Sequence, residues 1–241
     1  MLKTVINLSN VQTSKVWVGR VSYLKGLELQ DDVLQKMEKN EVQTCILGFE
    51  HPGVVSIGVR GSVSRDVCVS AQELHNHGFE LCQVSRGGEA TLHNLGQLVI
   101  YPILPLKKLG IGVRSFVHIL EQATRHCLGS FNVPLIPQQQ EPGVHSIRGK
   151  IGFIGLRIKK GISSHGVSIN VCNNLSNFTL IRSCGKLHGK HDRIIDWTDM
   201  VEPKQVYERW CDYFFQILKS SQTYPNEANA RELQKTNFCS Q

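Results

Sequence analysis

Residues 141–171, EPGVHSIRGKIGFIGLRIKKGISSHGVSINV, decide the fold class of this chain. Three runs rich in apolar and β-branched residues follow one another here, and the pairs Arg148-Gly149 and Lys160-Gly161 separate them. A pair that contains glycine between two such runs is typical of a tight β-hairpin turn. The stretch therefore predicts two consecutive hairpins.

Helix-like and strand-like segments surround these hairpins. Apolar residues recur at helical spacing in three segments, which begin near Ser22, at Val113 and near Pro203. Proline suits the first turn of a helix because its φ is already helical. Three further strand-like runs are TCILGFEH, VVSIGVRG and QLVIYPILPL.

The order of these segments favours a single α/β (α+β) domain in which helices pack against a mixed β-sheet. A chain of 241 residues can bury a substantial core in one domain, so no second domain is required. We expect the domain to occupy residues 1–219 and a polar, frayed tail to occupy 220–241.

Composition limits the compartment and the partners. No apolar run approaches the ~20 residues that span a bilayer, and MLKTVINLSN resembles neither a signal nor a transit peptide, so we expect no membrane association and a cytoplasmic protein. Eight cysteines without CxxC pairs fit a reducing compartment. The net charge of +7 favours an acidic partner: nucleic acid, anionic lipid or an acidic carrier protein.

The stretch RGGEATLH, residues 86–93, is the first candidate site. Paired glycines permit positive φ and close approach of a ligand, and they leave the amides of Gly87 and Gly88 free to donate to a carbonyl or carboxylate. Taken alone, the stretch fits a turn with a surface arginine better than a substrate loop. The chain has neither GxxxxGK[ST] nor GxGxxG, so nothing predicts a nucleotide site. The HNH sequence at 75–77 has no partners at metal spacing and predicts a solvated helix end.

Read together in order, RGGEATLHNLGQLVIYPIL, the stretch 141–171 and IRSCGK resemble the lipoyl(octanoyl) transferases over roughly residues 20–200. That family moves octanoyl groups from acyl carrier protein to lipoyl domains and has the biotin/lipoyl protein ligase type of fold. The resemblance implies that Cys184 accepts the acyl group and that Lys150 is paired with it. It also implies the substrate-contacting residues Arg86, Gly87, Gly88, Glu89, Ala90, Thr91, Leu92, His93, Phe153, Ile154, Gly155, His165, Gly166, Val167 and Ser168.

Four positions depart from the family pattern. Leu92 stands where the family has tyrosine, Asn94-Leu95 where it has Gly-Pro, and Ser183 where it has proline. The departures bear on pocket shape and chain-length preference and leave the catalytic pair unchanged.

The chemistry of such a pair follows from general principles. A thiolate is a strong nucleophile and a tolerable leaving group, so a second thioester divides one hard acyl transfer into two easier steps. A nearby ammonium stabilises the thiolate, and the same lysine in its neutral form can take a proton from the incoming amine. Backbone amides near Gly87-Gly88 and at Cys184 or Gly185 are candidate donors to the oxyanion. We expect His93 and His165 to shape the site, and we expect no metal, nucleotide or other cofactor.

The resemblance implies acyl carrier protein as donor and, as acceptors, the lipoyl domains of 2-oxoacid dehydrogenases and the glycine cleavage H protein. Three alternatives remain: an ATP-dependent lipoate-protein ligase on the same fold, a lipoyl amidotransferase that relays acyl groups between lipoyl-bearing proteins, and a basic nucleic-acid-binding module. No basic helix or aromatic-basic platform favours the third. The candidate docking charges are Lys107, Lys108, Arg157, Lys159 and Lys160.

Overall fold

The computed structural model describes residues 4–8, 11–139, 141–182 and 189–223, with the backbone alone described for 4–8, 11–13, 222 and 223. The helices are α1 (Tyr23–Glu38), α2 (Val63–Asp66), α3 (Ala71–Asn76), α4 (Val113–Gly129) and α5 (Pro203–Thr223), with short 3₁₀ turns at Leu175–Leu180 and Ile194–Asp196. The strands are β1 (Thr4–Leu8), β2 (Val11–Arg20), β3 (Thr44–Glu50), β4 (Val54–Ile57), β5 (Glu80–Gln83), β6 (Ala90–His93), β7 (Gln97–Ile103), β8 (Val144–His145), β9 (Lys150–Lys159) and β10 (Ile162–Asn170).

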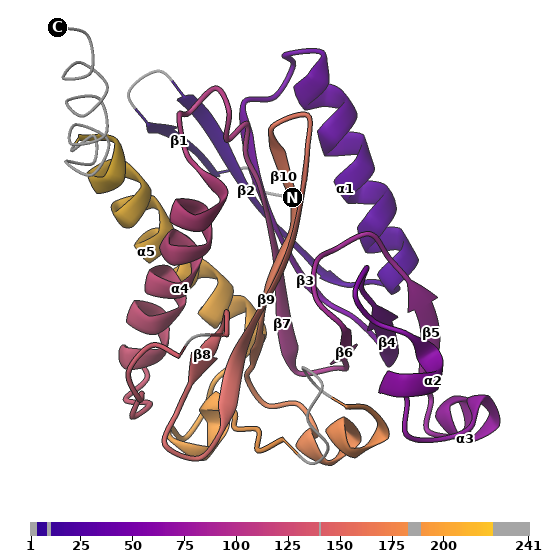
Figure 1. Cartoon of the computed structure of the whole chain (residues 1–241). Helices are drawn as coiled ribbons and strands as arrows, with labels where there is room; N and C mark the ends of the chain where they lie inside the picture. The colour runs from indigo at the N-terminus through magenta and orange to yellow at the C-terminus, as the bar shows by residue number, and fades with distance from the viewer. Residues whose placement is uncertain (1–3, 9–10, 140, 183–188, 224–241) are drawn as a thin grey trace, which may run out of the picture.

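The strands form two mixed sheets. The larger has the order β1-β2-β3-β7-β10-β9-β8, with β2 and β3 parallel and the other pairs antiparallel. The smaller has the order β5-β4-β6 and lies beside one end of the larger sheet (Figure 1). The fold class expected from the sequence is therefore observed.

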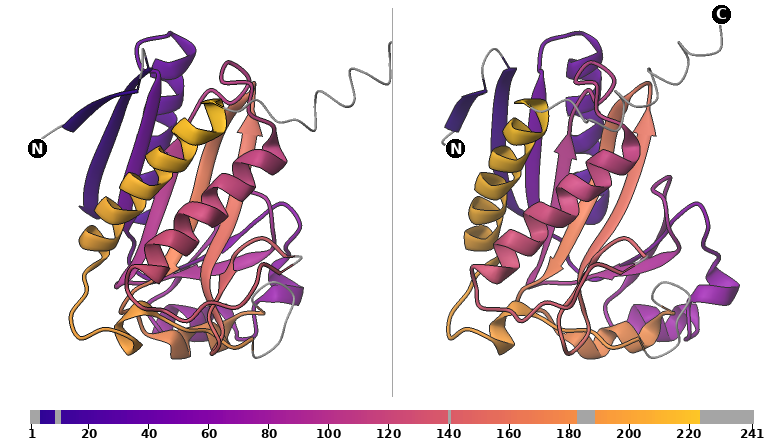
Figure 2. Two further views of the ribbon diagram at one scale, coloured as in Figure 1. Left: turned by 90° about the vertical axis from the view of Figure 1, so that its left-hand side faces the viewer. Right: turned by 60° about the vertical axis from the view of Figure 1, so that its left-hand side comes forward.

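Helices cover both faces of the larger sheet. Figure 2 shows α4 and α5 side by side in front of the sheet and α1 behind it. Alternation along β7 serves both layers: Leu98 and Ile100 join the core under α4 and α5, whereas Val99, Tyr101 and Ile103 join the core under α1.

The three helices that the sequence predicts, α1, α4 and α5, begin where it predicts them, whereas the sequence predicts no start for the short α2 and α3. The side chain of Ser22 accepts a hydrogen bond from the amide of Lys25 at the start of α1, and α5 opens on Pro203. Five residues of the apolar stripe predicted along α5 were expected to be buried: Val206, Trp210 and Phe214 are buried, whereas Tyr213 and Ile217 are only partly buried. Helix α5 continues to Thr223, into the segment expected to be a tail, and residues 224–241 lie outside the described part of the chain. No helix within the described ranges is both long and apolar enough to cross a membrane.

The second predicted hairpin forms as a long pair, β9 and β10. Its turn residues Lys160 and Gly161 have φ values of 52° and 78°, the left-handed conformation of a two-residue hairpin turn. The first predicted hairpin is much shorter, because β8 has two residues and its pairing with β9 is irregular. The Ser146 hydroxyl closes that turn by accepting from the amides of Arg148 and Gly149.

Candidate active site

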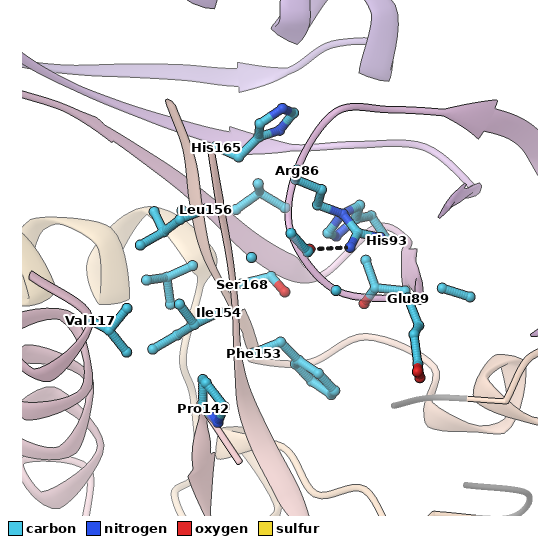
Figure 3. Close-up of a pocket in the computed structure, with 18 of the residues that line it drawn as sticks. Arg86, Glu89, His93, Val117, Pro142, Phe153, Ile154, Leu156, His165 and Ser168 are labelled. Atoms are coloured by element: carbon cyan, nitrogen blue, oxygen red, sulfur yellow. Dashed lines mark hydrogen bonds between the residues drawn. The ribbon is translucent and has the colours of Figure 1, made fainter. Parts of the chain in front are cut away.

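A cavity of about 590 Å³ lies around β9, between the loop that precedes β6 and the first turns of α4 (Figure 3). In Figure 3 the side chains of Val117 and Ile154 lie on one side of the β9–β10 ribbon, and Arg86 and His93 lie on the other. Apolar side chains predominate in the wall: Val59, Val99, Val113, Val117, Ile154, Leu156 and Val167. This is the lining that a hydrocarbon chain requires.

The structure brings most of the predicted site residues to this cavity. The lining includes Lys150 and the predicted substrate-contacting residues Arg86, Gly87, Gly88, Glu89, Ala90, Thr91, His93, Phe153, Ile154, Gly155, His165, Gly166, Val167 and Ser168. Cys184, predicted to be the nucleophile, lies outside the described residues, as do its neighbours Ser183 and Gly185.

Leu92 is the predicted contact residue that does not line the cavity. Its side chain is fully buried in an apolar cluster with Val55, Ile57 and Phe178. In β6, neighbouring side chains point to opposite faces of the strand, so Thr91 and His93 turn toward the cavity and Leu92 turns away.

The buried guanidinium of Arg86 holds the glycine loop in place by hydrogen bonds to Gly87 and to Ser56 of β4. The residue is 6% exposed, its Nη2 donates to the carbonyl oxygen of Ser56 at 2.6 Å, and its Nη1 donates to the carbonyl oxygen of Gly87 at 3.0 Å. Gly58 permits this packing, because a Cβ there would lie 2.8 Å from Nη1 of Arg86. A surface arginine, the reading favoured by the motif alone, is therefore wrong.

The two loop amides differ in their freedom to bind a ligand. The Gly87 amide donates to the carbonyl oxygen of Leu156 at 2.8 Å, so the expectation that it is free is wrong. Gly88 has a φ of 91°, as the glycine pair predicted, and within the described residues its amide has no hydrogen-bond partner. The hydrogen bond from the Gly87 amide to β9 fixes the loop, and the Gly88 amide is left available to a ligand.

His93 is a neutral hydrogen-bonded ring. Its Nδ1 lies 2.6 Å from Oε1 of Gln97, and the Gln97 amide nitrogen donates onward to Asn170. Nδ1 must therefore donate, which leaves Nε2 unprotonated. Burial lowers the pKa of His93 to about 3, with the nearby His51 contributing in the same direction. The geometry fits a residue that shapes the site.

His165 lies on β10 and has a backbone conformation that is unusual for a residue other than glycine. Its φ is 55°, and its amide donates to the side-chain oxygen of Gln30 on α1. Its ring meets that of Tyr101 edge-on with centroids 5.8 Å apart. Burial lowers the pKa of His165 to about 4, so this ring is also neutral at physiological pH.

Lys150 begins β9 and is 7% exposed. Its Nζ donates to the carbonyl oxygen of Pro142 at 3.2 Å and lies 5.3 Å from the centre of the Phe153 ring. Hydrogen bonds to the segment 190–192 fix the backbone of Lys150. Its amide donates to the carbonyl oxygen of Lys190, and its carbonyl oxygen accepts from the amide of Asp192. The amine thus stands at the cavity wall, largely withdrawn from solvent.

Several cavity residues were missed in the sequence. Tyr23, Val113 and Val117 lie in segments that the sequence predicts only as apolar stripes of helices, and Pro142 lies in the stretch 141–171 without a predicted role. Tyr101 lies in a strand run and carries a buried hydroxyl without a hydrogen-bond partner among the described residues. Nothing in the local sequence separates these side chains from ordinary core residues.

Comparison with known proteins decides the family. The family model described as "Lipoyl protein ligase A/B catalytic domain" matches residues 22–214. The chain belongs to this family. The family resemblance drawn from the motifs is therefore confirmed.

Relatives of the lipoyl protein ligase A/B family agree over most of the chain. The octanoyltransferase of Alkaliphilus metalliredigens is 36% identical over 169 residues, which cover 70% of this chain and 77% of that protein. The octanoyltransferase of Caldanaerobacter subterraneus is 33% identical over 202 residues, covering 84% and 88%. The mitochondrial octanoyltransferase of Arabidopsis thaliana is 33% identical over 176 residues, covering 72% and 74%.

Solved structures agree with the fold. The putative lipoate protein ligase of T. acidophilum with bound lipoic acid matches with a TM-score of 0.66 at 15% identity and covers 85% of each chain. The biotin protein ligase of Aquifex aeolicus matches with a TM-score of 0.54 at 12% identity, covering 87% of this chain and 72% of that one. The predicted ligase-like architecture is confirmed.

Proposed function

We propose that this protein is an octanoyltransferase of protein lipoylation, which moves the acyl group through a thioester at Cys184. The observation that carries the proposal is the amine of Lys150, withdrawn from water at the wall of a largely apolar cavity. The octanoyltransferases similar to this chain support the acyl group and the reaction class.

In the first half-reaction the Cys184 thiolate attacks the carbonyl carbon of the octanoyl-carrier thioester. The new C–S bond forms, the carrier C–S bond breaks, and the departing carrier thiolate takes a proton from the Lys150 ammonium, which leaves Lys150 neutral for the second half-reaction. A positive charge at Lys150 stabilises the attacking thiolate, because an opposite charge nearby favours the ionised sulfur.

In the second half-reaction the amine of an acceptor lysine attacks the Cys184 thioester. The C–N bond forms, the C–S bond breaks, the amine proton passes to neutral Lys150, and the thiolate is regenerated. The Gly88 amide is our candidate donor to the oxyanion in both steps, because it is unpaired among the described residues.

We propose acyl carrier protein as the donor and, as acceptors, lipoyl domains of 2-oxoacid dehydrogenases and the glycine cleavage H protein. The chemistry requires no nucleotide, metal or other cofactor, since the donor thioester is already activated. We propose the cytoplasm as the compartment because the mechanism needs Cys184 in its reduced form; within the part of the chain that the structure describes, Cys68, Cys82, Cys127, Cys172 and Cys211 form no disulfide.

The test is intact-protein mass spectrometry after incubation with octanoyl-acyl carrier protein, without ATP. We expect one added octanoyl mass that hydroxylamine removes and that Cys184→Ser abolishes. Cys68→Ser and Cys172→Ser remove exposed thiols elsewhere and are expected to acylate normally. Lys150→Met is expected to slow acylation about 100-fold, the lower end of what a positioned acid–base group contributes.

Three outcomes contradict the proposal. Wild-type protein that stays unmodified by the carrier thioester argues against a thioester intermediate. Transfer that needs free octanoate and ATP and survives Cys184→Ser supports a ligase, whereas acylation only from an octanoylated lipoyl protein supports an amidotransferase.

A further inference from the structure

A buried carboxylate lies on α4 beside the candidate site. Glu121 is 6% exposed and lies one turn after Val117, which lines the cavity, and one turn before the buried Thr124. A buried carboxylate is costly unless it is hydrogen-bonded. Its Oε1 accepts from the backbone amide of Gly143 at 3.1 Å.

The backbone of Gly143 packs directly against the side chain of Lys150. Its φ is 131°, and a Cβ there would lie 2.7 Å from the carbonyl oxygen of Gly152 and 2.8 Å from Cε of Lys150. Only glycine fits this backbone and this space, so the residue lets the chain pass directly over the lysine side chain.

A single peptide group joins Glu121 to Lys150. The N–H of Gly143 and the carbonyl of Pro142 belong to the same peptide bond, and that carbonyl accepts from Nζ of Lys150 at 3.2 Å. The peptide is planar and rigid, so a carboxylate that fixes its N–H also fixes the direction of its oxygen. Hydrogen bonds in such a chain polarise one another, which strengthens the acceptor that Lys150 meets.

We propose that Glu121 is a positioning residue that holds the ammonium of Lys150 through the Pro142–Gly143 peptide. Glu121 itself forms no ion pair with Lys150 in the described residues, so its action passes through the peptide. The role rests on the proposed function, since it matters only if Lys150 acts on the reacting groups.

The test compares Glu121→Met with Glu121→Gln. Methionine has a similar length and favours helix but cannot accept the Gly143 N–H, whereas the glutamine oxygen can. We expect Glu121→Met to lower kcat about 10-fold with the donor KM changed less than about 2-fold, because a displaced catalytic group affects the chemical step more than binding. Glu121→Gln is expected to stay within about 3-fold of wild type.

A second readout follows the thiol directly. The rate of iodoacetamide alkylation at the Cys184 peptide, measured by mass spectrometry against pH, should rise at higher pH in Glu121→Met than in wild type. Thr124→Val is the matched control: it is buried one turn further on α4, bonds Leu120 and Trp210, and is expected to change thermal stability without moving the alkylation profile.

Gly143→Ala displaces the same peptide from its other side and should shift the alkylation profile in the same direction as Glu121→Met. If Glu121→Met lowers only the melting temperature and keeps the wild-type kcat and alkylation profile, the positioning role is wrong. If wild-type Cys184 takes no acyl group, the proposed function fails as well, so the two failures are distinguishable.

Discussion

Three histidines in or next to the cavity lining are neutral because the fold buries their rings. His51 is fully buried, its Nδ1 donates to the carbonyl oxygen of Val21 at 3.0 Å, and its Nε2 has no hydrogen-bond partner among the described residues. Burial lowers the pKa of His51 to about 4, and it lowers those of His93 and His165 to about 3 and about 4. Three neighbouring rings therefore share one response to acid.

Acid should destabilise the protein through these rings. In the unfolded chain a histidine binds its proton near pH 6.5, whereas the folded rings do so only near pH 3–4, so the stabilising contribution is complete above pH 6.5 and is lost as the pH falls toward 4. Each ring contributes at most about 1.4 kcal/mol per pH unit in that window. We expect the free energy of unfolding in urea to fall steadily from pH 6.5 to pH 5.

His51→Asn isolates one ring, because asparagine can still donate to the Val21 carbonyl but does not titrate. The pH slope of the unfolding free energy should decrease by up to about 1.4 kcal/mol per unit. His75→Asn, on the exposed end of α3, should leave the slope unchanged. Equal slopes in wild type and His51→Asn would show that burial of His51 does not contribute to acid sensitivity.

Among the elements, the β9–β10 hairpin carries both the cavity wall and the turn that the sequence predicts most directly. Gly161 adopts a φ of 78°, and a Cβ there would lie 2.6 Å from Cβ of Lys107. A left-handed backbone costs a residue with a Cβ about 1–2 kcal/mol, and the contact adds to that cost. We expect Gly161→Ala to lower the free energy of unfolding by at least about 1 kcal/mol.

Gly129→Ala is the matched control. Gly129 ends α4, and a Cβ there meets nothing within 4 Å, so this change should stabilise the protein by about 0.5–1 kcal/mol. Urea denaturation of both variants measures the difference. Equal stability of Gly161→Ala and wild type would mean that the turn rearranges without cost.

For the whole molecule, the net charge of +7 favours an acidic partner. The fold determines which basic residues lie close enough to the candidate site to contact an acidic partner that binds there. Lys150 and Lys159 occupy opposite ends of β9, about 30 Å apart at ~3.3 Å per residue. Lys107 also lies at the hairpin end, where its amide donates to Gly161. Exposed Arg148 and Lys190 lie next to Lys150 instead.

Charge reversal at the two ends should therefore have different effects. We expect Arg148→Glu with Lys190→Glu to raise the donor KM about 10-fold at low salt and much less at 0.5 M salt, because the Debye length shortens. Lys159→Glu with Lys160→Glu keeps the same charge change and should have little effect. A larger effect at the hairpin end would place the carrier on that surface.

The sequence by itself determined the two consecutive hairpins, their turn glycines, the starts of three helices and the order of the motifs. Each of these depends on residues that lie close together in the chain. The ordered motifs were sufficient for the family, and the lining of the cavity contains nearly all the residues that they indicated. Local pattern did not reveal that Arg86 is buried or that Leu92 faces the core, since both depend on the packing of β4 and β6.

Only the tertiary structure decided how distant groups meet. The carbonyl oxygen of Leu156 accepts a hydrogen bond from the Gly87 amide. Glu121 and Lys150 are linked through hydrogen bonds to the peptide group between Pro142 and Gly143. These contacts join residues that are 8 to 69 positions apart in the chain. Backbone amides and carbonyls look identical in every sequence, and their availability is fixed only when another part of the chain folds against them.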